Sequence, residues 1–236
     1  MPNLTGKVAI VTGSTKGIGL AILERLHEAG ASVVVSARTG AEVAAVARRL
    51  GSRALGVPCD VADPAACQRL IDETVARFGR LDVLVNNAGF GIFKSITELT
   101  VDEWRSQIDV NLGGVFYCSK AALPHLAATG DGFVINIGSL AGRNYFAGGT
   151  GYNASKAGLM GLTEAMMLDV RHQNVRVSVI MPGSVNTWFR GNVQNAERSW
   201  PLEADDVALA VVQMLEYPKG AHPSRIELRP SRPERG

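Results

Sequence analysis

Short apolar runs rich in β-branched residues alternate with longer stretches of helical period along the whole 236-residue chain. Runs such as VAIVT and DVLVN are apolar on both faces, which is typical of parallel strands covered by helices on each side. The expected strands are Lys7–Thr12, Ser32–Ala37, Arg53–Pro58, Asp82–Asn86, Gly132–Gly138, Val175–Met181 and Ser224–Leu228. The expected helices are Gly17–Ala29, Ala41–Leu50, Pro64–Phe78, Val101–Ala128, Tyr152–His172 and Glu203–Glu216.

This repeating strand–helix order predicts an α/β fold in which right-handed crossovers build a doubly wound parallel sheet. Helix-capping chemistry supports the placements, since Asp63 precedes Pro64 at one expected helix start and Thr100 precedes Glu103 at another. No internal repeat, low-complexity segment or long flexible linker divides the chain. We therefore expect one domain over residues 1–236.

Composition narrows the class of protein. Hydrophobic residues make up 46% of the chain and charged residues 19%, which is enough apolar material for a buried core. The formal charge of +2 gives no reason to expect a nucleic acid or membrane partner. Cys59, Cys67 and Cys118 form no CxxC pair, and the four histidines show no metal-ligand spacing. We expect a soluble cytoplasmic protein without a metal.

A glycine-rich turn follows the first expected strand and leads directly into an apolar-periodic helix. Gly13 permits the tight turn, Gly17 lets a phosphate approach the backbone, and Gly19 lets the helix pack closely on the sheet. The helix N-terminus offers unpaired N–H groups to a pyrophosphate. The alternative is a turn without a ligand, but the strand–turn–helix context favours a dinucleotide site. Its predicted contacts are Gly13, Ser14, Lys16, Gly17, Ile18 and Gly19.

The residues after the second expected strand bear on which dinucleotide is bound. NAD would favour an acidic residue there for the ribose 2′-hydroxyl, but Ala37 and Arg38 follow the strand instead. Arginine can bind a 2′-phosphate through forked hydrogen bonds, and Lys16 would add a second positive charge. Both could be ordinary solvated cations. Because no acid follows the strand, the sequence favours NADP(H).

Two further segments fit a bound dinucleotide. Asp60 and Val61 follow the third expected strand, where the Asp60 carboxylate can accept a hydrogen bond from the adenine amino group. The small residues Asn87, Ala88 and Gly89 follow the fourth strand and leave room for a ribose or the adenine. Each segment taken singly is equally compatible with plain turn chemistry.

Tyr152 and Lys156 stand four residues apart at the start of a helical pattern, which places both side chains on one helix face. The phenol of tyrosine has an ordinary pKa near 10, too high for acid–base work at neutral pH. A lysine ammonium about 4 Å away favours the tyrosinate by roughly 4 kcal/mol at an intermediate dielectric. Tyr152 is therefore the predicted proton donor and acceptor, although the same spacing in isolation also suits an ordinary amphipathic helix.

Two polar residues complete the candidate catalytic group. Ser139 ends the fifth expected strand, and ligands of this architecture bind at the carboxyl ends of strands. Its hydroxyl can stabilise charge that develops on a substrate oxygen. Asn111 lies in the middle of an expected helix, where asparagine is disfavoured. A local kink with a water-mediated proton path to Lys156 would explain it, and an exposed helix position is the alternative.

Together these motifs resemble the short-chain dehydrogenase/reductase family from residue 7 to about residue 228. The resemblance implies a Rossmann-type parallel sheet of about seven strands in the order 3-2-1-4-5-6-7, with helices on both faces. It also implies a catalytic tetrad of Asn111, Ser139, Tyr152 and Lys156, in which Lys156 also holds the nicotinamide ribose. Along the nicotinamide and its phosphate it places Pro182, Gly183, Val185 and Thr187. In this family a basic residue like Arg38 accompanies NADP(H).

The residues expected to face a substrate are mostly aromatic or apolar and favour a hydrophobic carbonyl compound. They are Phe90, Phe93, Leu140, Asn144, Tyr145, Phe146, Trp188 and Phe189, next to an expected lid over Ser184–Trp200. Tyr145 lacks a lysine four residues later, so it is not a second catalytic tyrosine. The apolar content of Val101–Ala128 and Tyr152–His172 suggests a homodimer or homotetramer.

The sequence thus predicts an NADP(H)-dependent oxidoreductase that interconverts a ketone or aldehyde and an alcohol, with a small-molecule substrate. One alternative is a 3-oxoacyl-thioester reductase, although the Arg-Pro-Ser-Arg-Pro segment at 229–233 departs from that group. A second is a cofactor-binding redox sensor with little turnover, which would have no need of the four tetrad residues. An epimerase or dehydratase is a third, but such relatives usually carry a larger substrate region.

Overall fold

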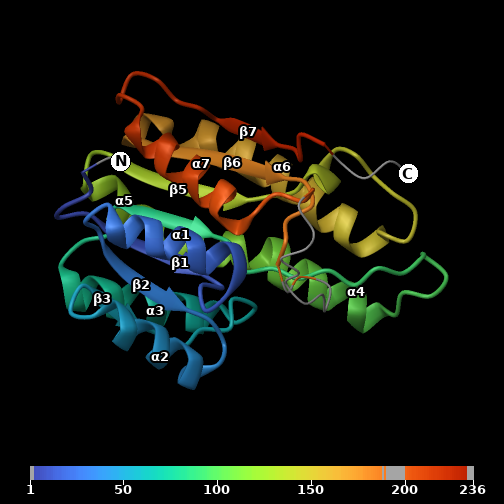
Figure 1. Cartoon of the computed structure of the whole chain (residues 1–236), viewed down its shortest axis with the longest axis horizontal. Helices are drawn as coiled ribbons and strands as arrows, with labels where there is room; N and C mark the ends of the chain where they lie inside the picture. The colour runs from blue at the N-terminus through green and yellow to red at the C-terminus, as the bar shows by residue number, and fades with distance from the viewer. Residues whose placement is uncertain (1–2, 188, 190–199, 233–236) are drawn as a thin grey trace.

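In the computed structural model, which describes residues 3–187, 189 and 200–232, seven parallel strands form one sheet (Figure 1). The strand order is β3-β2-β1-β4-β5-β6-β7, which confirms the predicted order 3-2-1-4-5-6-7. The strands are β1 Val8–Thr12, β2 Ser32–Ser36, β3 Ala54–Gly56, β4 Val83–Asn86, β5 Gly132–Ile137, β6 Val175–Pro182 and β7 Arg225–Leu228. Strands β1, β4 and β5 are buried on both faces because helices cover both sides.

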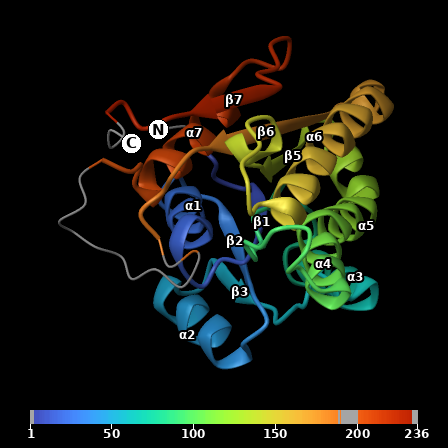
Figure 2. The ribbon, with the colours of Figure 1, turned by 90° about the vertical axis from the view of Figure 1, so that its right-hand side faces the viewer.

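Helices cover both faces of the sheet, as Figure 2 shows in a view turned by 90° from that of Figure 1. Helices α1, α2 and α7 pack on one face around one apolar core, and α3, α5 and α6 pack on the other around a second core. The α-helices are α1 Gly17–Glu28, α2 Gly40–Leu50, α3 Pro64–Phe78, α4 Val101–Ile108, α5 Gly114–Ala128, α6 Thr150–Val170 and α7 Ala204–Glu216. Cys59, Cys67 and Cys118 are free thiols buried in the second core, as small hydrophobic residues would be.

The single helix predicted over Val101–Ala128 is wrong, because a π-helical turn, η1 Asp109–Gly113, separates α4 from α5. The turn holds Asn111, whose buried side chain bonds to the backbone of Phe90 rather than facing solvent. Single π-helical turns of this kind occur frequently at functional sites. The third strand is also shorter than predicted, since β3 spans Ala54–Gly56, although the N–H groups of Val57 and Cys59 still donate to the carbonyls of Val35 and Ala37 at 2.9 and 3.0 Å.

Asp82 ties together the amino ends of the central strands. Its carboxylate, 1% exposed, accepts hydrogen bonds from the Val8 backbone N–H at 3.0 Å and from Lys7 Nζ at 3.1 Å. The Arg80 guanidinium donates two more, at 2.8 and 2.7 Å. Burial alone would raise the pKa of Asp82, but the bonds from Arg80, Val8 and Lys7 outweigh it and hold the pKa below its ordinary value.

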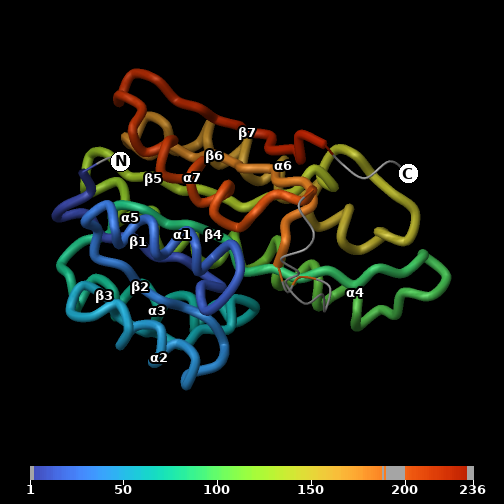
Figure 3. The backbone as a smooth tube through the Cα atoms, viewed as in Figure 1, coloured from blue at the N-terminus to red at the C-terminus, as the bar shows by residue number. Residues whose placement is uncertain are grey.

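The opposite, carboxyl end of the sheet carries the long connections. The segments that follow β4 and β5 project together beyond the strands, one leading to α4 and the other to α6 (Figure 3). This is the edge at which open α/β sheets bind ligands. Within the described residues, no helix has the length and apolar character needed to cross a bilayer.

Candidate active site

A cleft of about 1170 Å³ runs along the carboxyl ends of the strands. Turns after β1, β2, β3, β4, β5 and β6 all contribute to its walls, so segments far apart in sequence meet there. Nearly all of the predicted cofactor residues line it. They are Gly13, Lys16, Gly17, Ile18, Gly19, Arg38, Asp60, Val61, Asn87, Ala88, Gly89, Tyr152, Lys156, Pro182, Gly183, Val185 and Thr187.

Ser14 is the predicted cofactor residue that does not line the cleft. Its side chain is fully buried, and its Oγ accepts a hydrogen bond from the Ser36 N–H at 3.0 Å. The Ser14 N–H in turn donates to the Ser36 carbonyl at 3.0 Å. Ser14 therefore fixes the glycine-rich turn to the end of β2, and this geometry does not support a contact with the cofactor.

The glycine-rich turn packs so closely on the end of β4 that side chains have no room. Gly13 has a φ of +65°, and a Cβ there would lie 2.9 Å from the Ala88 Cα. A Cβ at Gly19 would collide with the Gly13 carbonyl oxygen and the Asn87 amide nitrogen. Asn87 Nδ2 donates to the carbonyls of Thr12 and Gly13 at 2.9 and 3.0 Å, which locks the turn against β4. The result is a bare backbone cradle at the N-terminus of α1, the form that a pyrophosphate requires.

Two cations stand at the end of the cleft nearest β2. Lys16 and Arg38 are both exposed and both line the cleft. Among the residues that the structure describes, neither makes an ion pair. Their donors are thus available to an anionic group, and a 2′-phosphate on the adenosine ribose fits this chemistry.

Sequence reasoning missed an acidic residue at this same end of the cleft. Glu42, in the first turn of α2, lines the cleft and accepts a hydrogen bond from the Thr15 hydroxyl at 3.1 Å. Glu42 lies beyond the end of β2 in the sequence, and the fold brings it back from α2 against the glycine-rich turn. Asp60, at the third strand, keeps its predicted place, although its Oδ1 also accepts from the Ala62 N–H at 3.0 Å.

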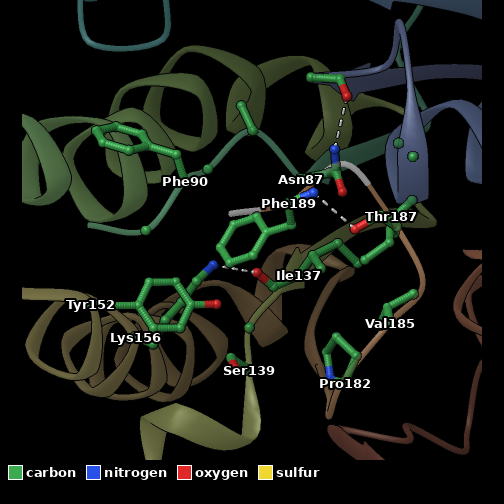
Figure 4. Close-up of a pocket in the computed structure, with 18 of the residues that line it drawn as sticks. Asn87, Phe90, Ile137, Ser139, Tyr152, Lys156, Pro182, Val185, Thr187 and Phe189 are labelled. Atoms are coloured by element: carbon green, nitrogen blue, oxygen red, sulfur yellow. Dashed lines mark hydrogen bonds between the residues drawn. The ribbon is translucent and has the colours of Figure 1, made fainter. Parts of the chain in front are cut away.

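Tyr152 and Lys156 lie one helical turn apart on α6 and face the cleft together with Ser139, which follows β5 (Figure 4). Tyr152 is 9% exposed, and its hydroxyl points into the cleft. Lys156 Nζ lies 6.0 Å from the centre of the Tyr152 ring and donates to the Ile137 carbonyl at 2.9 Å. Burial lowers the pKa of Lys156 to about 8, so the ammonium form still prevails at neutral pH.

Asn111 is buried behind this group and does not line the cleft. Its Oδ1 accepts from the Phe90 N–H at 3.0 Å, while its Nδ2 donates to the Phe90 carbonyl at 2.8 Å and to Ser155 Oγ at 3.0 Å. The side chain thus joins the π-helical turn η1, the segment after β4 and helix α6. A Cβ at Gly89 would lie 3.0 Å from Asn111 Oδ1 and 3.7 Å from Lys156 Nζ, so these two groups are close neighbours.

Aromatic rings surround the phenol of Tyr152. The Phe93 ring centre lies 5.2 Å from that of Tyr152 and 5.8 Å from that of Phe146, and the Phe189 ring centre lies 5.7 Å from that of Tyr152. We call Phe93, Phe146 and Phe189 the aromatic cluster. Leu140 and Asn144 also line the cleft, as expected of substrate-facing residues.

The other expected substrate-facing residues have different positions. Tyr145 is 66% exposed and does not line the cleft, because the chain turns its side chain outward beside Phe146. Phe90 does line the cleft; its backbone is held by Asn111, and its ring lies away from those of Tyr152 and Phe189 (Figure 4). Trp188 and most of the expected lid lie outside the described residues.

A parallel sheet of this order, a glycine cradle and a tyrosine–lysine pair in one cleft define a dinucleotide-dependent oxidoreductase of the short-chain type. Comparison with known proteins agrees, since the family model for short chain dehydrogenases matches residues 7–198. The chain therefore belongs to the short-chain dehydrogenase family. An uncharacterized oxidoreductase of Staphylococcus aureus strain MRSA252 is 38% identical, over 98% of this chain and 100% of that protein.

Two solved structures have the same fold over almost their whole length. An alcohol dehydrogenase from the archaeon Thermococcus sibiricus, complexed with 5-hydroxy-NADP, has a TM-score of 0.90 and 31% identity over 97% of this chain and 99% of that one. A metagenomic short-chain oxidoreductase in complex with NADP has a TM-score of 0.85 and 35% identity, over 98% of this chain and 100% of that one.

Proposed function

We propose that this protein is an NADP(H)-dependent oxidoreductase that interconverts a ketone or aldehyde and the corresponding alcohol. The observation that carries the proposal is the placement of Tyr152, Lys156 and Ser139 in one cleft with the glycine cradle. When bound, NADPH supplies the hydride that reduces the carbonyl carbon. The bare cradle at the N-terminus of α1 fits its pyrophosphate, and Lys16 and Arg38 fit its 2′-phosphate.

The chain's own side chains then supply the proton to the carbonyl oxygen and stabilise the negative charge that develops. The Ser139 hydroxyl donates a hydrogen bond to the carbonyl oxygen and holds it toward Tyr152. The Tyr152 hydroxyl gives its proton to that oxygen as the carbonyl becomes an alcohol, and the phenolate left behind is stabilised by the Lys156 ammonium. Asn111 acts behind these groups as a positioning residue, since its amide holds both Phe90 and Ser155.

The aromatic cluster supports a hydrophobic carbonyl substrate. The ring centres of Phe93 and Phe189 lie 5.2 and 5.7 Å from that of Tyr152, the proposed proton donor, and Phe146 extends this apolar surface by stacking on Phe93. A substrate that packs an apolar group against these rings places its carbonyl beside the Tyr152 hydroxyl.

The test is reduction of a broad panel of ketones and aldehydes, followed by the absorbance of NADPH. We expect turnover by the wild type and a loss of about 10²- to 10⁴-fold in Tyr152→Phe, because the proton donor is gone. NADPH affinity should change little in that variant. Tight NADPH binding with no turnover of any substrate by the wild type would overturn the proposal in favour of a redox sensor.

The proposed cofactor preference has its own test. Titration of the wild type with NADPH and NADH should show tighter binding of NADPH, and Arg38→Asp should reverse that order by removing one cation and adding an anion. Equal affinity for both cofactors in the wild type, unchanged in Arg38→Asp, would contradict the assigned role of Arg38.

We also propose one domain over residues 1–236 and a homodimer or homotetramer. Exposed apolar residues on the second helical layer support association, since Phe116 on α5 and Leu168 on α6 are 46% and 49% exposed. Light scattering coupled to size exclusion should give a mass of two or four chains. A monomer at micromolar concentration would contradict the proposal.

A further inference from the structure

The end of the cleft that carries Lys16 and Arg38 also carries a negative charge. The Glu42 carboxylate is exposed, lines the same cleft and sits in the first turn of α2, three residues beyond the end of the segment Arg38–Thr39. We infer that Glu42 is a specificity-determining residue that opposes the 2′-phosphate of NADP(H) and thereby keeps the preference over NAD(H) small. This inference rests on the proposed cofactor and names a residue that acts against it.

The charge of Glu42 is the first reason that it opposes a 2′-phosphate. Lys16 and Arg38 attract a 2′-phosphate, whereas Glu42 repels it, so the three side chains leave this end of the cleft with one net positive charge rather than two. NADH has a ribose hydroxyl in place of the phosphate and is nearly indifferent to all three charges. Glu42 should therefore weaken the binding of NADPH and leave that of NADH unaltered.

The second reason is that Glu42 occupies a hydrogen-bond donor of the cleft, the Thr15 hydroxyl. Thr15 belongs to the glycine-rich turn and lines the cleft, but its hydroxyl donates to the Glu42 carboxylate at 3.1 Å. That donor is lost to a 2′-phosphate unless the bond to Glu42 breaks first. A ribose hydroxyl, in contrast, carries no charge for the Glu42 carboxylate to repel and does not need the Thr15 donor. The charge of Glu42 and its bond to Thr15 thus both weaken the binding of NADPH relative to that of NADH.

A purely structural role for Glu42 predicts something different. An acidic residue in the first turn of a helix is stabilised by the helix dipole, and α2 has no side-chain cap from Thr39. If Glu42 served only α2, replacing it would alter stability slightly and leave the ratio of cofactor affinities unchanged. The ratio is thus the readout that separates the two roles.

The experiment measures the Kd of NADPH and of NADH by cofactor fluorescence at fixed low ionic strength for the wild type and Glu42→Gln. We expect Glu42→Gln to bind NADPH about five- to tenfold more tightly, as for a carboxylate and a dianion about 6 to 8 Å apart in water. The Kd of NADH should stay within about twofold. The gain should shrink as salt is added, since exposed charges are screened.

The matched control is Glu73→Gln, which removes the same charge from an exposed position on α3 outside the cleft. It should leave both Kd values within about twofold. Equal tightening of NADH and NADPH in Glu42→Gln, or an unchanged ratio, would overturn the inference while leaving the proposed cofactor intact. If the wild type binds neither dinucleotide, the proposed function itself fails, whatever the variants do.

Discussion

Replacing Lys156 by methionine should stabilise the folded protein near neutral pH while abolishing the proposed turnover. The Lys156 side chain is buried, with the residue 6% exposed, and its Nζ donates to the Ile137 carbonyl at 2.9 Å. In the part of the chain that the structure describes, no carboxylate lies within ion-pair distance of it. Among the described residues, the buried charge thus has a hydrogen-bond acceptor but no counter-ion, an arrangement that favours chemistry over stability.

The size of the effect follows from the pKa of Lys156. Burial lowers it from 10.5 to about 8, and the gap between these values corresponds to about 3 kcal/mol of unfolding free energy. Methionine is unbranched and fills a similar volume without a charge. Replacing Lys156 by methionine also removes the hydrogen bond from Nζ to the Ile137 carbonyl, which costs about 1 kcal/mol. The net expectation is a gain of about 2 kcal/mol at pH 7.

The gain has a defined pH dependence. Below the folded pKa of about 8, Lys156 is charged in both the folded and unfolded states, so the penalty is fully present. Between about 8 and 10.5 the unfolded chain holds the extra proton, and the stability of the wild type rises with pH as the penalty is relieved. The difference between Lys156→Met and the wild type should therefore shrink over this window.

Urea unfolding at pH 7 and at intervals up to pH 10 measures both the gain in unfolding free energy and its dependence on pH. Lys120→Met serves as the control, because Lys120 is an exposed lysine on α5 and should show no such pH-dependent gain. If Lys156→Met is no more stable than the wild type at pH 7 and both follow the same pH dependence, the ammonium is solvated and the reasoning is wrong.

Three other substitutions test the framework of the sheet and of the cleft. Asn111→Ala leaves both backbone groups of Phe90 without partners and should lower the unfolding free energy by about 2 to 4 kcal/mol in urea titrations, with Asn111→Asp intermediate. Asp82→Asn should cost about 2 kcal/mol above pH 4, and this difference should vanish as acid takes the pH down through the lowered folded pKa. Gly19→Ala should weaken NADPH binding at least about tenfold because its Cβ collides with the turn. The open helical position of Gly161 is its control, since alanine there should stabilise by up to about 1 kcal/mol without altering the Kd.

The sheet and the meeting of Tyr152, Lys156 and Ser139 in one cleft could be predicted because their signals are local. Apolar runs of β-branched residues specify strands, and their alternation with helical periods specifies parallel crossovers. The spacing of Tyr152 and Lys156 places both on one helix face wherever the helix lies. Ser139 and Asn87 follow strands, and the carboxyl ends of parallel strands meet at one edge. None of these inferences required knowledge of a long-range contact.

The misses arise where a long-range contact decides the outcome. Ser14 sits in a turn whose direction the sequence does not reveal, and its hydroxyl turned out to bind the backbone of Ser36 rather than face the cleft. The position of Glu42 in the cleft follows only from the fold, in which the first turn of α2 lies against Thr15. Tyr145 and Phe146 are adjacent aromatic residues in one loop, and only the fold determines which of them faces inward.

The π-helical turn at Asn111 combines a local signal in the sequence with long-range contacts in the fold. The sequence identified Asn111 because asparagine is disfavoured inside a helix, which is a local signal. Its partners, Phe90 and Ser155, are 21 and 44 residues away, so the sequence could suggest a kink at Asn111 but not the contacts that stabilise it. Because Gly89 has no side chain, the amide reaches the segment after β4 and lies beside Lys156. One side chain thus holds Phe90, which lines the cleft, and braces the helix that carries Tyr152 and Lys156, so long-range hydrogen bonds offset its unfavourable place in the helix.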